Sequence, residues 1–177
     1  RKFNPIGRKH NCLSNPHYRE AISKMVNAMA AHYLEEDAVI AWQIDNELGL
    51  PICYCETCAK GFREWLKNKY KELDELNERW GTVFWSLEYS DWDQLRVPVQ
   101  PFHEVPNPSM ILDHRRFNSD LCCDYLKLQA DILRKYNPEW TITHNMMGTY
   151  ERAIVNYFDM AKHLDVAGWD NYPVGFM

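Results

Sequence analysis

The sequence has 177 residues, of which 46% are hydrophobic and 25% are charged, a composition typical of one globular domain with a buried core. Its net charge of −5 argues against nucleic-acid binding, which needs a basic surface to neutralise phosphates. No apolar run approaches the ~20 residues that a membrane-spanning helix requires.

The first part of the chain predicts a helix, a strand and two more helices. Asn15 followed by a proline is typical of a helix start, and apolar residues then recur at helical spacing. The nearly all-apolar run 39–44 predicts a strand covered on both faces, as in a parallel sheet. Two helices are expected over 62–70 and 73–80, the second ending at Gly81.

The rest of the chain continues the alternation of helices and strands. Residues 82–108 are irregular and rich in Trp and Pro, and a loop of this length is usually functional. A long helix is expected over 108–136, and strands over 140–143 and 165–169 flank a helical segment at 154–164. The order predicts an α/β fold with parallel strands joined by helical crossovers.

Polar residues follow each predicted strand, and this pattern locates a candidate active site. In a (β/α)8 barrel the active site lies at the carboxyl ends of the strands. A doubly wound sheet has the same polarity, but no glycine-rich phosphate loop follows any of these strands. The residues concerned are Asp45, Asn46 and Glu47 after the first strand, His144 and Asn145 after the second, and Asp170 and Tyr172 after the third.

Glu47 is the candidate general acid. A carboxyl group at the rim of an apolar strand is partly desolvated, which favours the protonated form that an acid catalyst needs. Asn46 can both donate and accept hydrogen bonds, as recognition of a sugar hydroxyl requires. The structural alternative is a loop carboxylate that caps the following segment.

Cys53, Cys55 and Cys58 form a cluster that predicts a metal site. They lie too close together to act as a disulfide framework, whereas thiolates are preferred zinc ligands. The alternative is three free thiols. A fourth ligand must come from elsewhere; Cys12, just before a helix, is favoured over the other candidates, which are Cys122, Cys123 and a nearby histidine.

Several motifs together resemble one known family. WQIDNE, CYCETC, FREWLKNKY, LNERWGTVFWS, PNPS, THN and WDNYP occur in this order between about Gly7 and Met177. They resemble the glycoside hydrolases of family 42, which are bacterial β-galactosidases. The resemblance implies a (β/α)8 catalytic barrel (a TIM barrel) and retaining hydrolysis of terminal β-D-galactosides.

The resemblance also implies roles for individual residues. Glu47, at the end of the fourth barrel strand, matches the acid/base that donates a proton. Four residues match positions that bind the substrate: Arg8, Asn46, Trp85 and Tyr172. Cys12 matches the distant ligand that joins the three clustered cysteines around a structural Zn²⁺. Relatives form trimers, and reduced cysteines together with family habit imply a cytoplasmic location.

Compared with the family, residues 1–177 are expected to be a single segment of the catalytic barrel, about strands four to six. The family's nucleophile is a glutamate on the seventh strand, so we expect this segment to be inactive alone. Two other readings stay open. One is a glycosidase that acts on α-L-arabinopyranosides or other β-glycosides. The other is a non-catalytic, zinc-stabilised module that binds a carbohydrate or a partner.

Overall fold

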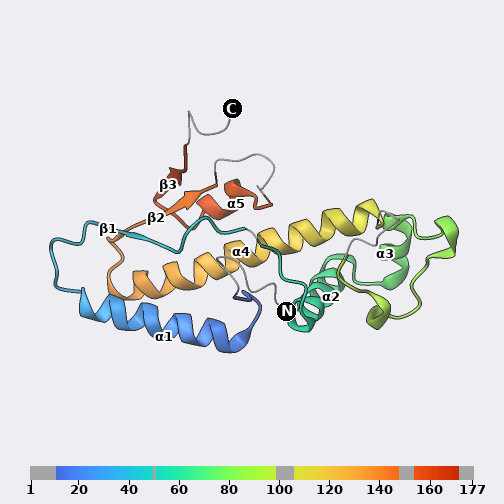
Figure 1. Ribbon diagram of the computed structural model, residues 1–177, viewed down its shortest axis with the longest axis horizontal. Coiled ribbons are helices and arrows are strands. Elements are labelled where there is room, and N and C mark those ends of the chain that lie inside the picture. The colour runs from blue at the N-terminus through green and yellow to red at the C-terminus, as the bar shows by residue number, and fades with distance from the viewer. Residues whose placement is uncertain (1–10, 50, 99–105, 148–153, 172–177) are drawn as a thin grey trace.

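The computed structural model describes residues 11–49, 51–98, 106–147 and 154–171, and its elements follow the predicted order (Figure 1). The long helix α4 runs through the molecule, with the strands at one of its ends and α2 and α3 at the other. The elements are α1 (Pro16–His32), β1 (Ala41–Gln43), α2 (Glu56–Tyr70), α3 (Leu73–Trp80), the 3-10 turns η1 (Phe84–Ser86) and η2 (Trp92–Gln94), α4 (Pro108–Tyr136), β2 (Thr141–Met146), α5 (Tyr157–Ala161) and β3 (Val166–Trp169).

The described strands form one parallel sheet in the order β1-β2-β3, which confirms the α/β prediction. In register, Trp42 pairs with Ile142, and His144 pairs with Ala167. A Cβ atom on Gly168 would lie 2.8 Å from the carbonyl oxygen of His144, so only glycine allows β3 to approach β2 this closely. The sheet formed by the described strands is open, with β1 and β3 at its edges, and does not close into a barrel.

Local capping explains why the starts of α1 and α4 and the end of α3 were predictable, whereas α2, which has no side-chain cap, begins at Glu56 rather than at 62. The Asn15 side chain accepts hydrogen bonds from the backbone N–H groups at the start of α1, and Asn107 does the same for α4. Gly81 ends α3 in the left-handed conformation, with φ 63°. The helix expected over 154–164 is shorter, because Asn156 caps it and α5 begins only at the next residue.

Among the described residues, two hydrophobic cores lie along α4. The first packs the sheet and α1 against the C-terminal part of α4, where Tyr125, Leu126 and Ile142 are fully buried. The second packs α2 and α3 against the N-terminal part of α4, where Phe62 and Leu66 are fully buried. None of the described helices is long and apolar enough to cross a membrane.

The expectation that the 39–44 strand is covered on both faces is wrong for the described residues. β1 is an edge strand that packs only the Trp42 side against the helices, while Ala41 and Gln43 are exposed. Ile40 is 86% exposed, and Trp169 on β3 is 62% exposed. The apolar sequence of this strand predicts that both of its faces are covered. The described residues cover only one of them.

Candidate active site and metal centre

The carboxyl ends of the three strands meet at Asn145. Its Nδ2 donates hydrogen bonds to Asn46 Oδ1 and Asp170 Oδ2, both at 3.0 Å. Its Oδ1 accepts from the backbone N–H of Glu47 at 3.1 Å and from Gln43 Nε2 at 3.2 Å. Both donors and both acceptor positions of this amide are thus used, which fixes its orientation between the three strand ends.

The backbone around Glu47 has an unusual conformation. Asp45 and Glu47 have φ values of 52° and 44°, in the left-handed region that non-glycine residues rarely adopt. Each such residue costs about 1–3 kcal/mol and persists only where the surrounding structure holds it. Contacts from β2 hold this segment, and strain of this kind is typical of functional sites.

Glu47 and Asn46 lie side by side at this edge, as the sequence predicted. Asn46 Nδ2 donates to Glu47 Oε2 at 3.2 Å, so the amide orients the carboxyl group. Both side chains are partly exposed, which leaves them accessible to a ligand above the sheet. A positioned carboxyl group with a hydrogen-bonding amide beside it can donate a proton to a bound sugar and hold its hydroxyl groups.

The other predicted substrate-binding residues are not brought together with Glu47 in the described structure. Arg8 and Tyr172 lie outside the described residues. Trp85, with φ 60°, is 76% exposed in η1. It lines a groove of about 920 Å³ between η1 and the start of α2, together with Tyr54 and Arg63 among others.

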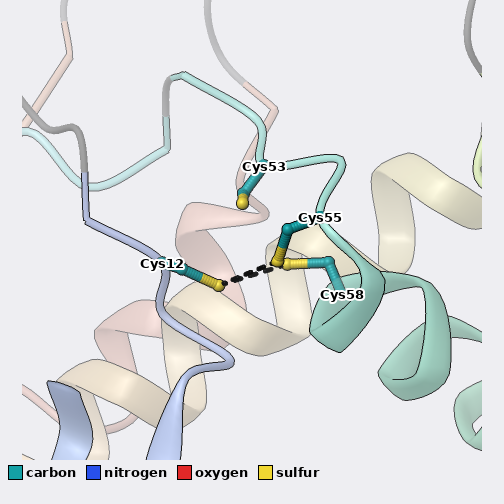
Figure 2. Close-up of side chains that lie close together, drawn as sticks. All are labelled: Cys12, Cys53, Cys55 and Cys58. Carbon is teal, nitrogen blue, oxygen red and sulfur yellow. Dashed lines mark hydrogen bonds between the residues drawn. The ribbon is translucent and has the colours of Figure 1, made fainter. Parts of the chain in front are cut away.

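The four predicted cysteine ligands do come together (Figure 2). Their Sγ atoms all lie within 4.8 Å of one another, and Cys12 Sγ is 3.5 Å from Cys58 Sγ and 3.6 Å from Cys55 Sγ. Cys12 comes from the segment before α1, whereas the other three come from the loop before α2 and its first turn. The separations are far longer than the ~2.05 Å of a disulfide bond, so these cysteines are thiols.

The close sulfur contacts shift the pKa values of the cluster. The hydrogen bond between Cys12 and Cys58 lowers the pKa of Cys12 to about 5 and raises the pKa of Cys58. Burial raises the pKa of Cys53.

The donor set fits a tetrahedral metal ion. With Zn–S bonds of ~2.3 Å, the sulfur atoms of a tetrahedral site made of four cysteines lie about 3.8 Å apart, close to the separations found here. Four thiolate ligands with no position left for water are typical of a structural site rather than a catalytic one. The remaining cysteine candidates for the fourth ligand, Cys122 and Cys123, are buried on α4 and do not belong to this group.

The chain is similar over nearly its whole length to one known family of proteins. The model of the glycoside hydrolase 42 family, described as beta-galactosidase, matches residues 1–176. A curated relative, beta-galactosidase Bga of Halorubrum lacusprofundi, is 39% identical over 173 residues, which cover 96% of this chain and 24% of the relative.

Solved structures give the same result. The beta-galactosidase from the psychrophilic Marinomonas ef1 has a TM-score of 0.90 at 37% identity, with 98% of this chain and 26% of that chain covered. The beta-galactosidase from Rahnella sp. R3 has a TM-score of 0.89 at 39% identity, with 96% and 24% covered. The chain thus spans about a quarter of the length of the relatives it matches.

Proposed function

Because this chain belongs to glycoside hydrolase family 42, we propose that the complete protein is a retaining β-galactosidase and that Glu47 is its acid/base. The observation that carries the proposal is the arrangement at the sheet edge. There, Asn145 joins the ends of all three strands and holds the strained Glu47 backbone beside Asn46.

In the proposed mechanism Glu47 protonates the glycosidic oxygen as the bond to the leaving group breaks. A second carboxylate, ~5–5.5 Å away, attacks the anomeric carbon and forms a glycosyl-enzyme. Glu47 then removes a proton from the water that hydrolyses this intermediate. The nucleophile is proposed to lie on a later barrel strand, so residues 1–177 are a single segment of the barrel and are inactive alone.

We propose that Asn46 hydrogen-bonds a sugar hydroxyl, and that Arg8, Trp85 and Tyr172 complete the substrate site. Nearness of Asn46 to Glu47 supports the first assignment. The aromatic face of Trp85 is exposed and suits stacking on a sugar or packing at a trimer interface.

We further propose that Cys12, Cys53, Cys55 and Cys58 bind a structural Zn²⁺. A bound zinc ion would join the segment before α1 to the start of α2 and so brace the loop that follows Glu47. The site needs four reduced cysteines, which supports a reducing compartment such as the cytoplasm.

The test is a panel of aryl glycosides with the complete protein. We expect β-galactosides to be cleaved faster than α-L-arabinopyranosides or β-glucosides, with the β-anomer as the first product seen by ¹H NMR. Glu47→Gln is expected to lower kcat/KM for phenyl β-galactoside by about 10²–10⁴-fold. Cleavage with inversion, or an unaffected Glu47→Gln variant, would overturn the proposal.

A further inference from the structure

His144 is a buried imidazole that contacts both ends of the Glu47 segment. It lies on β2 and is fully buried, on the same side of the strand as Ile142, which packs into the first core. Its Nδ1 lies 2.7 Å from the carbonyl oxygen of Ile44, and its Nε2 lies 3.1 Å from the backbone nitrogen of Leu48. The two backbone groups flank the three residues Asp45, Asn46 and Glu47.

The two contacts define the proton positions on the ring. The Leu48 N–H can only donate, so Nε2 must accept and carries no proton. Nδ1 therefore carries the proton and donates it to the Ile44 carbonyl oxygen. A neutral imidazole with one donor and one acceptor therefore spans the bend formed by residues 45–47. An apolar side chain could make neither of these hydrogen bonds.

His144 and Asn145 hold the bend from opposite faces of the same strand. Successive residues of a strand point to opposite sides, and Asn145 accepts from the Glu47 N–H while His144 accepts from the next N–H, that of Leu48. The backbone on both sides of the Glu47 Cα is thereby fixed, although φ at Glu47 is 44°.

We propose that His144 is a positioning residue that holds Glu47 in the left-handed conformation from which its carboxyl group protonates the leaving group. The inference rests on the proposed acid/base role of Glu47. The imidazole is buried beneath the bend and acts through Glu47, not by contact with the substrate.

The experiment uses the complete protein and two substrates that differ in their need for an acid. Phenyl β-galactoside has a poor leaving group that must be protonated, whereas 2,4-dinitrophenolate leaves without help. kcat/KM is measured for both with three variants. His144→Phe removes both hydrogen bonds, His144→Asn keeps a donor near Nδ1, and His144→Gln keeps an acceptor near Nε2.

His144→Phe is expected to lower kcat/KM for the phenyl substrate by about 10–100-fold and to leave the dinitrophenyl substrate almost unchanged. The Asn and Gln variants are expected to lose less on the phenyl substrate, and they carry the test if His144→Phe does not fold. Equal losses on the two substrates, or no loss on either, would overturn the proposal.

Two controls separate this result from other causes. His114 is also a buried histidine, 2% exposed, but it packs against Phe62 and Phe117 in the second core. His114→Phe is expected to leave the ratio of the two kcat/KM values unchanged. Glu47→Gln tests the premise: if it shows no dependence on the leaving group, the proposed acid/base role fails, whatever the His144 variants do.

Discussion

The two ends of α4 are stabilised in different ways (Figure 1). At the α2–α3 end the core is enclosed by neighbouring helices, and Leu76 and Leu95 are fully buried. At the sheet end one side packs on α1 and α4, but Ile40, Val166 and Trp169 are exposed. The core of the helical end is thus closed by described residues, although Val83, Phe84 and Trp85 in the loop after α3 are exposed. At the sheet end the strands themselves have an apolar surface that a larger barrel would cover.

Polar groups differ in the same way. Asp113, 2% exposed, satisfies its carboxylate with Lys69, Tyr70, Trp80 and Arg116, all within the helical end. Asn145 instead joins three strand ends at an edge that is open to solvent. The Asp113 network lies within the packed helical end, where losing one partner would leave buried polar groups unsatisfied. The network at the sheet edge, in contrast, is proposed to position a reactive group.

The largest effect is expected from Asp113. Asp113→Ala removes the buried carboxylate that accepts from Lys69, Tyr70 and Trp80, and it is expected to lower the free energy of unfolding by about 3–5 kcal/mol. Urea unfolding of the 1–177 chain measures this. Asp120→Ala, which removes an exposed carboxylate bonded to Trp65, is the control and is expected to cost under about 1 kcal/mol. Similar losses for the two variants would contradict the difference between buried and exposed carboxylates.

Metal removal is expected to act next most strongly and to affect the segment between α1 and α2. If the free zinc concentration is 100–1,000 times the Kd of the four-cysteine site, removing the zinc with a chelator lowers the free energy of unfolding by roughly 2.7–4.1 kcal/mol. Native mass spectrometry is expected to find one zinc per chain, and none in Cys58→Ser. Cys123→Ser, outside the cluster, is expected to retain the metal. Retention of zinc by Cys58→Ser would show that the site lies elsewhere.

Acid is expected to weaken the helical end through Asp113. Burial opposes ionisation of this carboxyl group, but hydrogen bonds from Lys69, Tyr70 and Trp80 outweigh burial and hold its pKa below the ordinary value. Its contribution to stability is therefore complete above the unfolded pKa of about 3.9 and is lost as pH falls through the lower folded value. Below pH 4, the urea midpoint of Asp113→Asn should fall less steeply with decreasing pH than that of the unchanged chain. Identical pH profiles would show that titration of Asp113 does not cause the loss of stability in acid.

The smallest effect is expected at the exposed side of the sheet. Trp169→Ser should change the stability of the 1–177 chain by less than about 0.5 kcal/mol, since the side chain is 62% exposed. In the complete protein the same change should cost clearly more, because a larger barrel would bury this residue. Equal effects in the two proteins, measured by thermal unfolding, would mean that β3 stays exposed.

Sequence reasoning succeeded where the signal was local. Asn15, Asn107 and Gly81 mark helix ends through contacts with near neighbours, and the spacing of three cysteines predicts their cluster. The prediction for β1 failed because burial of an apolar strand depends on the segments that pack against it. The described residues include such segments on only one face of β1. The contacts of His144 could not be predicted, since its partners are backbone atoms 96 and 100 residues away.

The central claim, that Glu47 is the acid/base, is tested most directly by azide rescue of Glu47→Gln in the complete protein. With 2,4-dinitrophenyl β-galactoside the glycosyl-enzyme still forms, and azide needs no base to attack it. The account predicts a faster turnover with azide and β-galactosyl azide as the product. Formation of α-galactosyl azide would identify Glu47 as the nucleophile and contradict the account, as would the absence of any rescue.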